Sequence, residues 1–364
     1  MATVLHYVEH WLELSAGFVH AHVARSRHRG VVVSHNATEN LDAFPVAPLW
    51  RLDRFHRLVP DRRWPGVRTA VLRAGAAAYR TDVVHVHFGY VAGDVVPMVR
   101  SSGRPLVLSL HGHDVTALPV RQPHHYDEIA DVAAAVIVPS RFLRDAVVAI
   151  GFDPQRVHVI PSGIDTAWFA PTPLPERPTV AFVGRLVEKK GIDVLLRAWP
   201  AVRARVPEAS LQILGDGPLS SLLGEAAAIG VTHVRPNPQR GAQQVRDLVR
   251  SARIVTTPSR TAADGDAESL LLVNLEAQAS GRPVVTTRHG GIPDFVEDGA
   301  SALLVAENDS DELAAALVRV LDDDKLATQM AAHGPVVAAR FDAGRCTAAV
   351  DDLYDELSRR RDRK

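Results

Sequence analysis

Glu268-Ser-Leu-Leu-Leu-Val-Asn-Leu-Glu276 is the segment that says most about the fold of this chain. It places two carboxylates eight residues apart, on either side of an apolar run. If the whole segment is helical, the two side chains lie about 80° apart on one broad face. If the helix begins at the apolar run, Glu268 stands at its mouth and Glu276 two turns inside. Either arrangement can serve one elongated polar ligand, although a glutamate in a first helical turn is also stabilised by the helix dipole alone.

Short apolar runs that end in glycine turns lie on both sides of this segment. Downstream is Val284-Val-Thr-Thr-Arg-His-Gly-Gly-Ile-Pro-Asp294. Upstream are Val180-Ala-Phe-Val-Gly-Arg-Leu-Val-Glu-Lys-Lys-Gly191 and Leu211-Gln-Ile-Leu-Gly-Asp-Gly-Pro218. Each pattern predicts a buried parallel strand, then a tight loop, then a helical segment.

Strand-like runs alternate with helix-length stretches along the whole chain, which predicts parallel sheets with crossover helices. The expected strands are residues 4–7, 31–34, 83–87, 106–110, 135–139 and 157–161, and then 180–183, 211–214, 233–235, 254–257, 283–286 and 302–305. Residues 169–178 contain four prolines and are the natural linker between the two series. We therefore expect an α/β protein with two doubly wound, Rossmann-like domains, whose ligands bind at the carboxyl ends of the strands.

Composition limits the class of protein. A chain of 364 residues can form two domains, and its net charge of −1 and apolar content of 46% are typical of a globular protein. A near-zero charge disfavours nucleic-acid binding. Cys346 is the only cysteine, so no disulfide can form within the chain. Because no apolar run approaches a membrane span and the first residues do not have the pattern of a signal peptide, we expect a cytoplasmic location.

These motifs, taken together and in order, resemble those of the retaining glycosyltransferases of family 4, which have the GT-B fold. The resemblance covers nearly the whole chain. In the first half it rests on His85-Val-His-Phe-Gly89, Leu110-His-Gly-His-Asp-Val-Thr116, Val138-Pro-Ser140 and Ile160-Pro-Ser-Gly-Ile-Asp165. The histidine-glycine motifs look most like those of the subgroup that builds exopolysaccharides such as colanic acid.

The resemblance implies a division of labour along the chain. Residues 1–168 would form the acceptor-side domain and residues 169–346 the donor domain, with a cleft between them. Residues 347–364 would form a last helix that crosses back to the first domain. The expected reaction moves a sugar from a nucleoside-diphosphate sugar to a hydroxyl of a saccharide, lipid-linked or natural-product acceptor, and the departing phosphate helps to deprotonate that hydroxyl.

Donor-site residues follow from the resemblance. Arg185 and Lys190 would hold the diphosphate, in a loop where backbone N–H groups and a helix start also favour an anion. Glu276 would bind the ribose hydroxyls, and Glu268 would lie near the donor sugar and its leaving phosphate. The remaining donor contacts would come from Gly184, Gly215, Ser269, Leu270 and Leu271. The last three replace the glycines of the Glu-Gly-Phe-Gly sequence found in many members, which alters the backbone contacts available there.

The first domain supplies the other expected site residues. His111 follows a strand and matches the family histidine that contacts the donor sugar near the reacting carbon. We therefore assign His111 and Glu268 as the catalytic residues, and we expect Asp114 to cap a helix. The glycine-glycine loop of many members is replaced by Leu14-Ser-Ala-Gly-Phe18, which makes Ser15 and Gly17 acceptor-loop candidates, together with His87.

Two His-x-His pairs, His85/His87 and His111/His113, raise the question of a metal site. Period-two spacing puts each pair on one face of a strand, and four histidines can bind zinc. The chain contains 17 histidines, however, so close pairs are expected by chance. The family requires neither a metal nor another cofactor, and we expect none here.

Residues 51–80 form a basic segment with eight arginines and two aspartates, a net charge of +6. Trp50, Phe55 and Trp64 are interleaved with the arginines. A solvated helix face over core aromatics would explain this pattern. The functional alternative is a surface that attracts anionic lipid headgroups or an anionic acceptor, which would place the enzyme peripherally on the inner face of the plasma membrane.

The sequence leaves two rival functions open. A sugar-nucleotide epimerase can share this fold, although the two glutamates with Arg185 and Lys190 argue against it. A non-catalytic sugar-nucleotide-binding subunit is suggested by the missing glycines at 269–271. A dinucleotide oxidoreductase is disfavoured, because no expected strand is followed by Gly-x-Gly-x-x-Gly.

Overall fold

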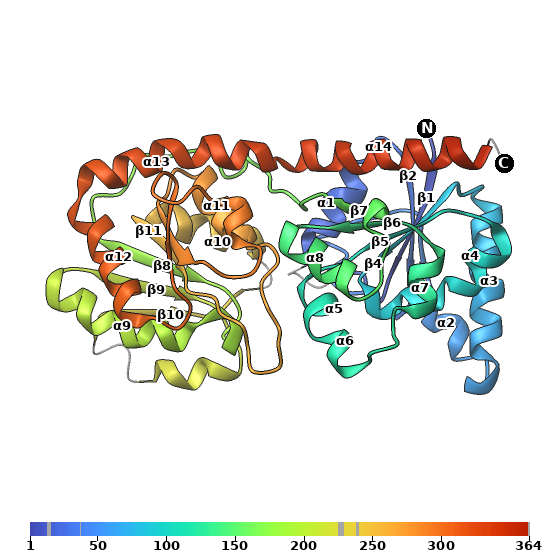
Figure 1. Cartoon of the computed structure of the whole chain (residues 1–364), viewed down its shortest axis with the longest axis horizontal. Coiled ribbons are helices and arrows are strands. Elements are labelled where there is room, and N and C mark those ends of the chain that lie inside the picture. Colours follow the sequence, from blue (N-terminus) through green and yellow to red (C-terminus); the bar gives the residue numbers. More distant parts are fainter. Residues whose placement is uncertain (13–15, 37, 225–228, 238–239, 363–364) are drawn as a thin grey trace. The chain divides into compact units, whose positions relative to one another are not determined.

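The structure is a computed structural model that describes residues 1–12, 16–36, 38–224, 229–237 and 240–362. It divides into two compact units (Figure 1). The first unit contains Met1–Gly163 together with Ala343–Lys364, and the second contains Ile164–Asp342. Within the described ranges, no helix is both long and apolar enough to cross a membrane.

The first unit is built on a seven-stranded parallel sheet with the order β3-β2-β1-β4-β5-β6-β7. Its strands are β1 (Thr3–Val8), β2 (Arg29–Ser34), β3 (Leu49–Arg51), β4 (Val83–His87), β5 (Leu106–Ser109), β6 (Ala133–Val138) and β7 (Val157–Val159). Its helices are α1 (Gly17–Arg25), α2 (Asp53–His56), α3 (Trp64–Ala78), α4 (Val96–Ser102), α5 (Gly112–Thr116), α6 (Leu118–Arg121), α7 (Asp127–Val132), α8 (Arg141–Ala149) and α14 (Ala343–Asp362).

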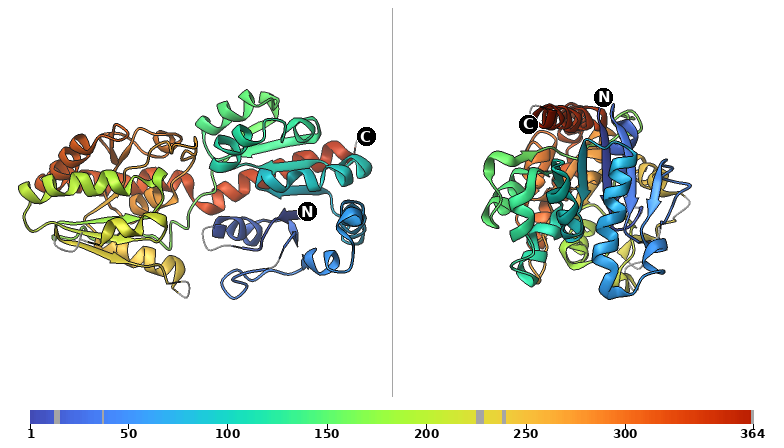
Figure 2. Two further views of the ribbon diagram at one scale, coloured as in Figure 1. Left: turned by 90° about the horizontal axis from the view of Figure 1, so that it is seen from below. Right: turned by 90° about the vertical axis from the view of Figure 1, so that its right-hand side faces the viewer.

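Alternation along the strands of the first sheet produces two buried faces. Leu5 and Val84 belong to the larger core, which includes side chains of α3, α4, α7 and α8. Val4 and Val83 point to the other face, where they pack with apolar side chains of α14. Helix α14 therefore forms part of the hydrophobic core of the first unit, and Figure 2 shows it beside α1.

The second unit has a six-stranded parallel sheet with the order β10-β9-β8-β11-β12-β13. Its strands are β8 (Thr179–Val183), β9 (Ser210–Leu214), β10 (Val231–Val234), β11 (Ile254–Thr257), β12 (Val284–Thr287) and β13 (Ala302–Val305). Its helices are α9 (Ile192–Arg205), α10 (Gly241–Ser251), α11 (Leu272–Ala279), α12 (Ser310–Asp322) and α13 (Asp324–Ala338). One face of the sheet packs with α9, α12 and α13, and the other packs with α10 and α11.

The predicted α/β class and the alternation of strands and helices are confirmed, and each expected strand has a counterpart. Strand β3 was not expected. It pairs with β2 from Val32↔Leu49 to Ser34↔Arg51, and its three residues are too few to show a period in the sequence.

The proline-rich segment packs on the second unit. The buried Arg282 guanidinium donates to the carbonyl oxygens of Thr172 and Pro173, at 2.9 and 3.1 Å, and Arg253 donates to the carbonyl of Pro175 at 3.0 Å. These bonds satisfy the carbonyl groups of a segment that forms no helix or strand of its own. The two compact units meet at Gly163/Ile164 and at Asp342/Ala343. The resemblance implied domain bounds at 168 and 346.

Candidate functional site

A buried ion pair marks the candidate donor site in the second unit. Lys190 Nζ lies 2.7 Å from Glu268 Oε1. Burial alone would raise the pKa of the Glu268 carboxyl, but Lys190 and Lys189 outweigh it and hold that pKa below its usual value. Burial lowers the pKa of Lys190 in spite of the nearby carboxylate. The loop after β8 and the loop after β11 thus place opposite charges together in a largely dehydrated position.

Glycines allow the backbone of these loops to approach closely. A Cβ on Gly191 would stand 1.8 Å from the Pro258 carbonyl oxygen, and one on Gly290 would stand 2.1 Å from the carbonyl oxygen of Glu268. Both glycines have positive φ angles, of 65° and 51°, which other residues rarely adopt. A side chain at Gly191 would push the Lys190 loop away from the loop after β11, and one at Gly290 would push the loop after β12 away from Glu268.

His289 fixes the backbone at Glu268. The Glu268 N–H donates to His289 Nε2 at 3.1 Å, and His289 Nδ1 lies 2.9 Å from a Glu307 carboxylate oxygen. Since Nε2 accepts, the ring proton is on Nδ1 and points at Glu307. No role could be predicted for His289 from the sequence, because this bond forms only when the loop after β12 folds over residue 268.

Helix α11 begins at Leu272, so Glu268 lies in the preceding loop. The expectation that Glu276 lies two turns inside is wrong: it is the fifth helical residue, about one turn in. The Glu276 carboxylate is half-buried, and burial raises its pKa to about 7. Among the described residues it has no hydrogen-bond or ion-pair partner.

The remaining donor-site candidates fall into two groups. Gly184 and Gly215 lie side by side, since a Cβ on Gly215 would stand 2.1 Å from the Gly184 carbonyl oxygen. Gly184 also lies next to Lys190, because a Cβ there would be 3.7 Å from the lysine side chain. Arg185 is exposed beside them, close enough for its charge to lower the pKa of Lys190. The neighbouring Lys189 is paired with Asp266, its Nζ lying 2.9 Å from a carboxylate oxygen.

Residues 269–271 offer their backbone more than their side chains. Leu271 is buried in an apolar cluster, Leu270 packs at the edge of another, and Ser269 is buried. Their N–H groups, at the start of α11, have no acceptor in the described part of the chain. Unpaired N–H groups at a helix start favour an anion.

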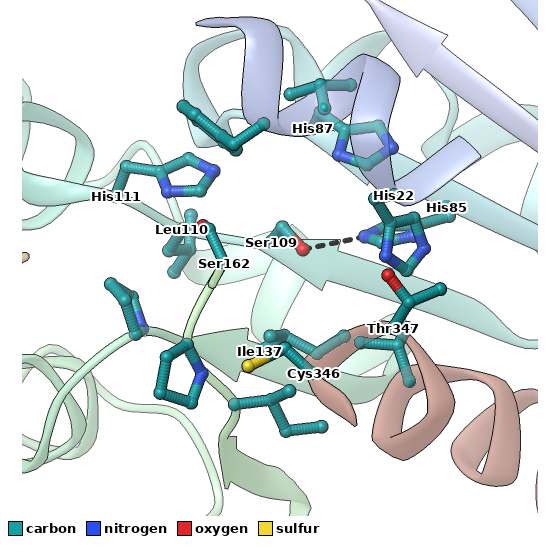
Figure 3. Close-up of a pocket in the computed structure, with 16 residues that line it drawn as sticks. His22, His85, His87, Ser109, Leu110, His111, Ile137, Ser162, Cys346 and Thr347 are labelled. Atoms are coloured by element: carbon teal, nitrogen blue, oxygen red, sulfur yellow. Dashed lines mark hydrogen bonds between the residues drawn. The ribbon is translucent and has the colours of Figure 1, made fainter. Parts of the chain in front are cut away.

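His111 lines a pocket in the first unit (Figure 3). Its ring lies between Phe18 and Phe88, with each ring centroid 4.8 Å away. Burial lowers its pKa to about 4, so the imidazole is neutral at pH 7. Its Nε2 is buried without a hydrogen-bond partner in the described residues. An unpaired buried nitrogen on a pocket wall suits contact with a polar ligand.

Asp114 caps the helix that follows His111. It accepts hydrogen bonds from the N–H groups of Gly89 and His111, each at 3.1 Å, and burial nevertheless raises its pKa to about 7. The expected capping role agrees with these bonds.

The acceptor-loop candidates are dispersed. Gly17 begins α1, where an added Cβ would lie 3.2 Å from the Phe44 ring, so its small size has a packing reason. Ser15 lies outside the described residues. His87 is buried, and it lines the same pocket as His111 (Figure 3).

The basic segment 51–80 is largely a surface. Six of its arginines are exposed, namely Arg54, Arg57, Arg62, Arg63, Arg73 and Arg80. Arg51 and Arg68 are paired with Asp53 and Asp94, at 2.7 Å each. The aromatic residues of this segment differ in burial: Trp64 is buried and stacked on His56, whereas Phe55 is 42% exposed. The nearby aliphatic residue Leu58 is 81% exposed.

Comparison with known proteins gives the family. Residues 13–168 match the family described as Glycosyltransferase Family 4, and residues 177–323 match Glycosyl transferases group 1. A GDP-mannose-dependent alpha-(1-6)-phosphatidylinositol monomannoside mannosyltransferase of Mycolicibacterium smegmatis is 36% identical over 273 residues, which are 70% of this chain and 71% of that protein. The putative colanic acid biosynthesis glycosyltransferase WcaL of Escherichia coli is 29% identical, over 80% of this chain and 75% of its own.

Solved structures agree at the level of the fold. Anabaena HepE in complex with UDP and glucose has a TM-score of 0.79 with 18% identity, over 98% of this chain and 100% of that one. The chain therefore belongs to glycosyltransferase family 4 and has the GT-B fold. It is a nucleotide-sugar-dependent enzyme of this retaining family, and the functional prediction made from the sequence is confirmed at that level.

Proposed function

We propose that this enzyme transfers a hexose from a nucleoside-diphosphate sugar, bound in the second unit, to a hydroxyl of an anionic lipid-linked acceptor. The observation that carries the donor assignment is the buried Lys190–Glu268 pair, at 2.7 Å, beside the free N–H groups of residues 269–271. A diphosphate bound there would meet an ammonium, a helix start and the exposed guanidinium of Arg185. All three are positive or partly positive, and they would stabilise the negative charge that develops on a leaving diphosphate.

The donor carboxylates have separate roles in this proposal. Glu268 is ionised and sits next to the phosphate-binding ammonium, where it orients Lys190 and faces the donor sugar. Glu276, unpaired and one helical turn further on, accepts hydrogen bonds from the ribose hydroxyls. Two or more hydroxyl groups would supply hydrogen bonds to this half-buried carboxylate, which has no partner among the described protein groups.

The acceptor assignment rests on charge and on similarity. The exposed arginines of residues 51–80 and the exposed Phe55 and Leu58 suit a membrane surface that carries anionic headgroups. The Mycolicibacterium relative acts, by its name, on a phosphatidylinositol monomannoside. GDP-mannose with a phosphatidylinositol monomannoside is therefore the first donor and acceptor pair to test, with UDP-glucose as the alternative donor.

The donor proposal is tested by nucleotide calorimetry. Lys190→Ala should weaken GDP or UDP binding roughly ten- to hundredfold, since a charge-assisted contact contributes about 1.5–3 kcal/mol. Arg185→Ala should have a smaller effect in the same direction, because its guanidinium is exposed. Lys325→Ala, an exposed lysine on α13, is the matched control. Unchanged affinity in Lys190→Ala and Arg185→Ala, with both proteins folded by circular dichroism, would refute the phosphate assignment.

A further inference from the structure

Three histidines gather on one face of the first sheet. Strands β1 and β4 are paired in parallel with His6 opposite His85, and His87 lies two residues beyond His85 on the same face. All three side chains are almost completely buried. The sequence alone pointed to the pairs His85/His87 and His111/His113 and led us to expect no metal, whereas the fold brings His6 beside His85 and His87.

The ring nitrogens of these histidines converge. His6 Nδ1 lies 3.0 Å from His87 Nε2, and one ligand nitrogen from each of the three rings can be chosen so that all lie within 4.8 Å of one another. We propose that His6, His85 and His87 form a binding site for a divalent transition-metal ion, with zinc as the ion they suit best. A metal held by two imidazoles at about 2.0–2.1 Å places their nitrogens slightly more than 3 Å apart, close to the spacing found here.

The chemistry of the three side chains suits this ion. Imidazole ligands favour zinc, copper and nickel over magnesium or calcium, which prefer oxygen. A neutral imidazole binds an ion through the lone pair of its unprotonated nitrogen. In the hydrogen-bonded His6–His87 pair, the ring proton that lies between the two nitrogens would move to a nitrogen away from the ion, which is a change of tautomer.

Outer partners are already in place for His85. Its Nε2 lies 2.7 Å from the Ser109 hydroxyl, and its Nδ1 is hydrogen-bonded to Tyr354 on α14. Whichever nitrogen binds the ion, the other keeps a hydroxyl partner that holds the ring. Such outer hydrogen bonds usually orient metal-binding histidines.

A fourth ligand position is available from the pocket. His85 and His87 line the pocket of about 40 Å³ that His22 and Ser109 also line (Figure 3). That volume can hold a few water molecules. The His22 ring centroid is 5.7 Å from that of His85 and 6.1 Å from that of His87. Three protein ligands with water, or with His22 after a small shift, complete a tetrahedral zinc site.

The test uses the full chain, stripped of metal by a chelator and dialysed. Titration with ZnCl₂ by calorimetry should show one saturable site per chain, and CoCl₂ should produce the strong visible bands of four-coordinate cobalt. X-ray absorption of the zinc form should show imidazole nitrogens at about 2.0–2.1 Å. Wild-type protein that binds neither ion, or a zinc shell without imidazoles, would overturn the proposal and leave the histidines as a hydrogen-bonded core.

Variants separate this site from surface binding. His6→Gln and His87→Gln should each weaken zinc binding at least tenfold and abolish the cobalt spectrum. His124→Gln, whose side chain is 89% exposed, is the matched control and should bind as wild type does. If either core variant retains full affinity, the ion binds elsewhere and the proposal fails. If both variants unfold, the wild-type absorption experiment still decides the matter. Nucleotide binding in the second unit is measured in parallel, so failure here is distinct from failure of the donor site.

Discussion

The candidate site residues of this glycosyltransferase differ in whether their buried polar groups have a partner within the protein. Lys190 and Glu268 compensate each other at 2.7 Å, whereas Glu276 and the Nε2 of His111 have no partner in the described chain. A paired group mainly holds the neighbouring loops in position. A buried polar group without a protein partner is free to hydrogen-bond a ligand. The kinetic expectations depend on a second difference, namely the part of the donor that each side chain would contact.

Glu268→Gln and His111→Ala should lower kcat by about 10²–10³, because both groups would contact the donor where charge changes as the bond breaks. Glu276→Gln should instead raise the donor KM, since a contact with ribose is alike in ground and transition states. Steady-state kinetics with circular dichroism as a folding check measures all three. Near-normal kcat in both Glu268→Gln and His111→Ala would show that catalysis depends on other residues.

Glu276 should also make the stability of the free enzyme depend on pH. Its folded-state pKa of about 7 lies above the unfolded value, so the folded form binds the extra proton. This contribution is present at pH 4.5 and below, and it is lost as the pH rises through 7. Glu276→Gln, which cannot ionise, should therefore gain thermal stability relative to wild type between pH 5 and pH 8. A melting-temperature difference that stays constant over this range would contradict the raised pKa.

At the residue level, the sequence indicated which residues are candidates for the donor site better than it indicated the contacts those residues make. The loop lysine and the two glutamates could be named because the motifs that contain them resemble those of family 4. Nothing in the sequence showed that Lys189 pairs with Asp266 or that His289 binds the backbone of Glu268, since both contacts join loops far apart in the chain.

Elements follow local pattern closely, except where they are short. The expected strands were found because β-branched runs recur between helices. Strand β3 has three half-buried residues, and its pairing with β2 depends on tertiary position. Helix α11 shows the opposite case. The sequence allowed a helix over all of residues 268–276 or one that begins at the apolar run, and the observed helix begins at Leu272. The close approach of Gly290 to the Glu268 backbone holds residue 268 in the loop before the helix.

The segment containing α2 and α3 should bind anionic membranes. Wild-type protein should sediment with liposomes that contain phosphatidylinositol and much less with neutral ones, and the binding should weaken with salt because the Debye length falls to about 3 Å at 1 M. Phe55→Ser with Leu58→Ser should reduce binding, because these exposed apolar side chains would enter the interface.

Val336→Ser, at an apolar residue that is 56% exposed on α13, is the control for this experiment. Equal sedimentation with both kinds of liposome at low salt would show that the arginines of residues 51–80 are only a solvated surface.

At the scale of the whole molecule, α14 is a component of the first unit despite its position at the end of the chain. Tyr354 is completely buried and bonds to His22 and His85, and Leu353 and Leu357 pack on the sheet. Deleting residues 343–364 should therefore destabilise the first unit by more than the 2–5 kcal/mol typical of one large core truncation.

Calorimetry of this truncated chain should show loss of the first unit's transition, while nucleotide binding by residues 164–342 persists. Tyr354→Phe, which keeps the ring and removes only the hydroxyl, is the milder companion variant. If truncated and full-length chains melt alike, α14 contributes little to the first unit.

The place of α14 also sets the order in which the chain can be completed during its synthesis. The first unit has β1 to β7 by residue 159, but the helix that covers Val4 and Val83 begins at residue 343. At 5–20 residues per second, the ribosome needs roughly 10–35 seconds to cover that interval. The second unit starts later yet has all of its residues first. Until α14 is made, the nascent chain therefore exposes the apolar residues that this helix later buries, which makes them a natural binding place for chaperones.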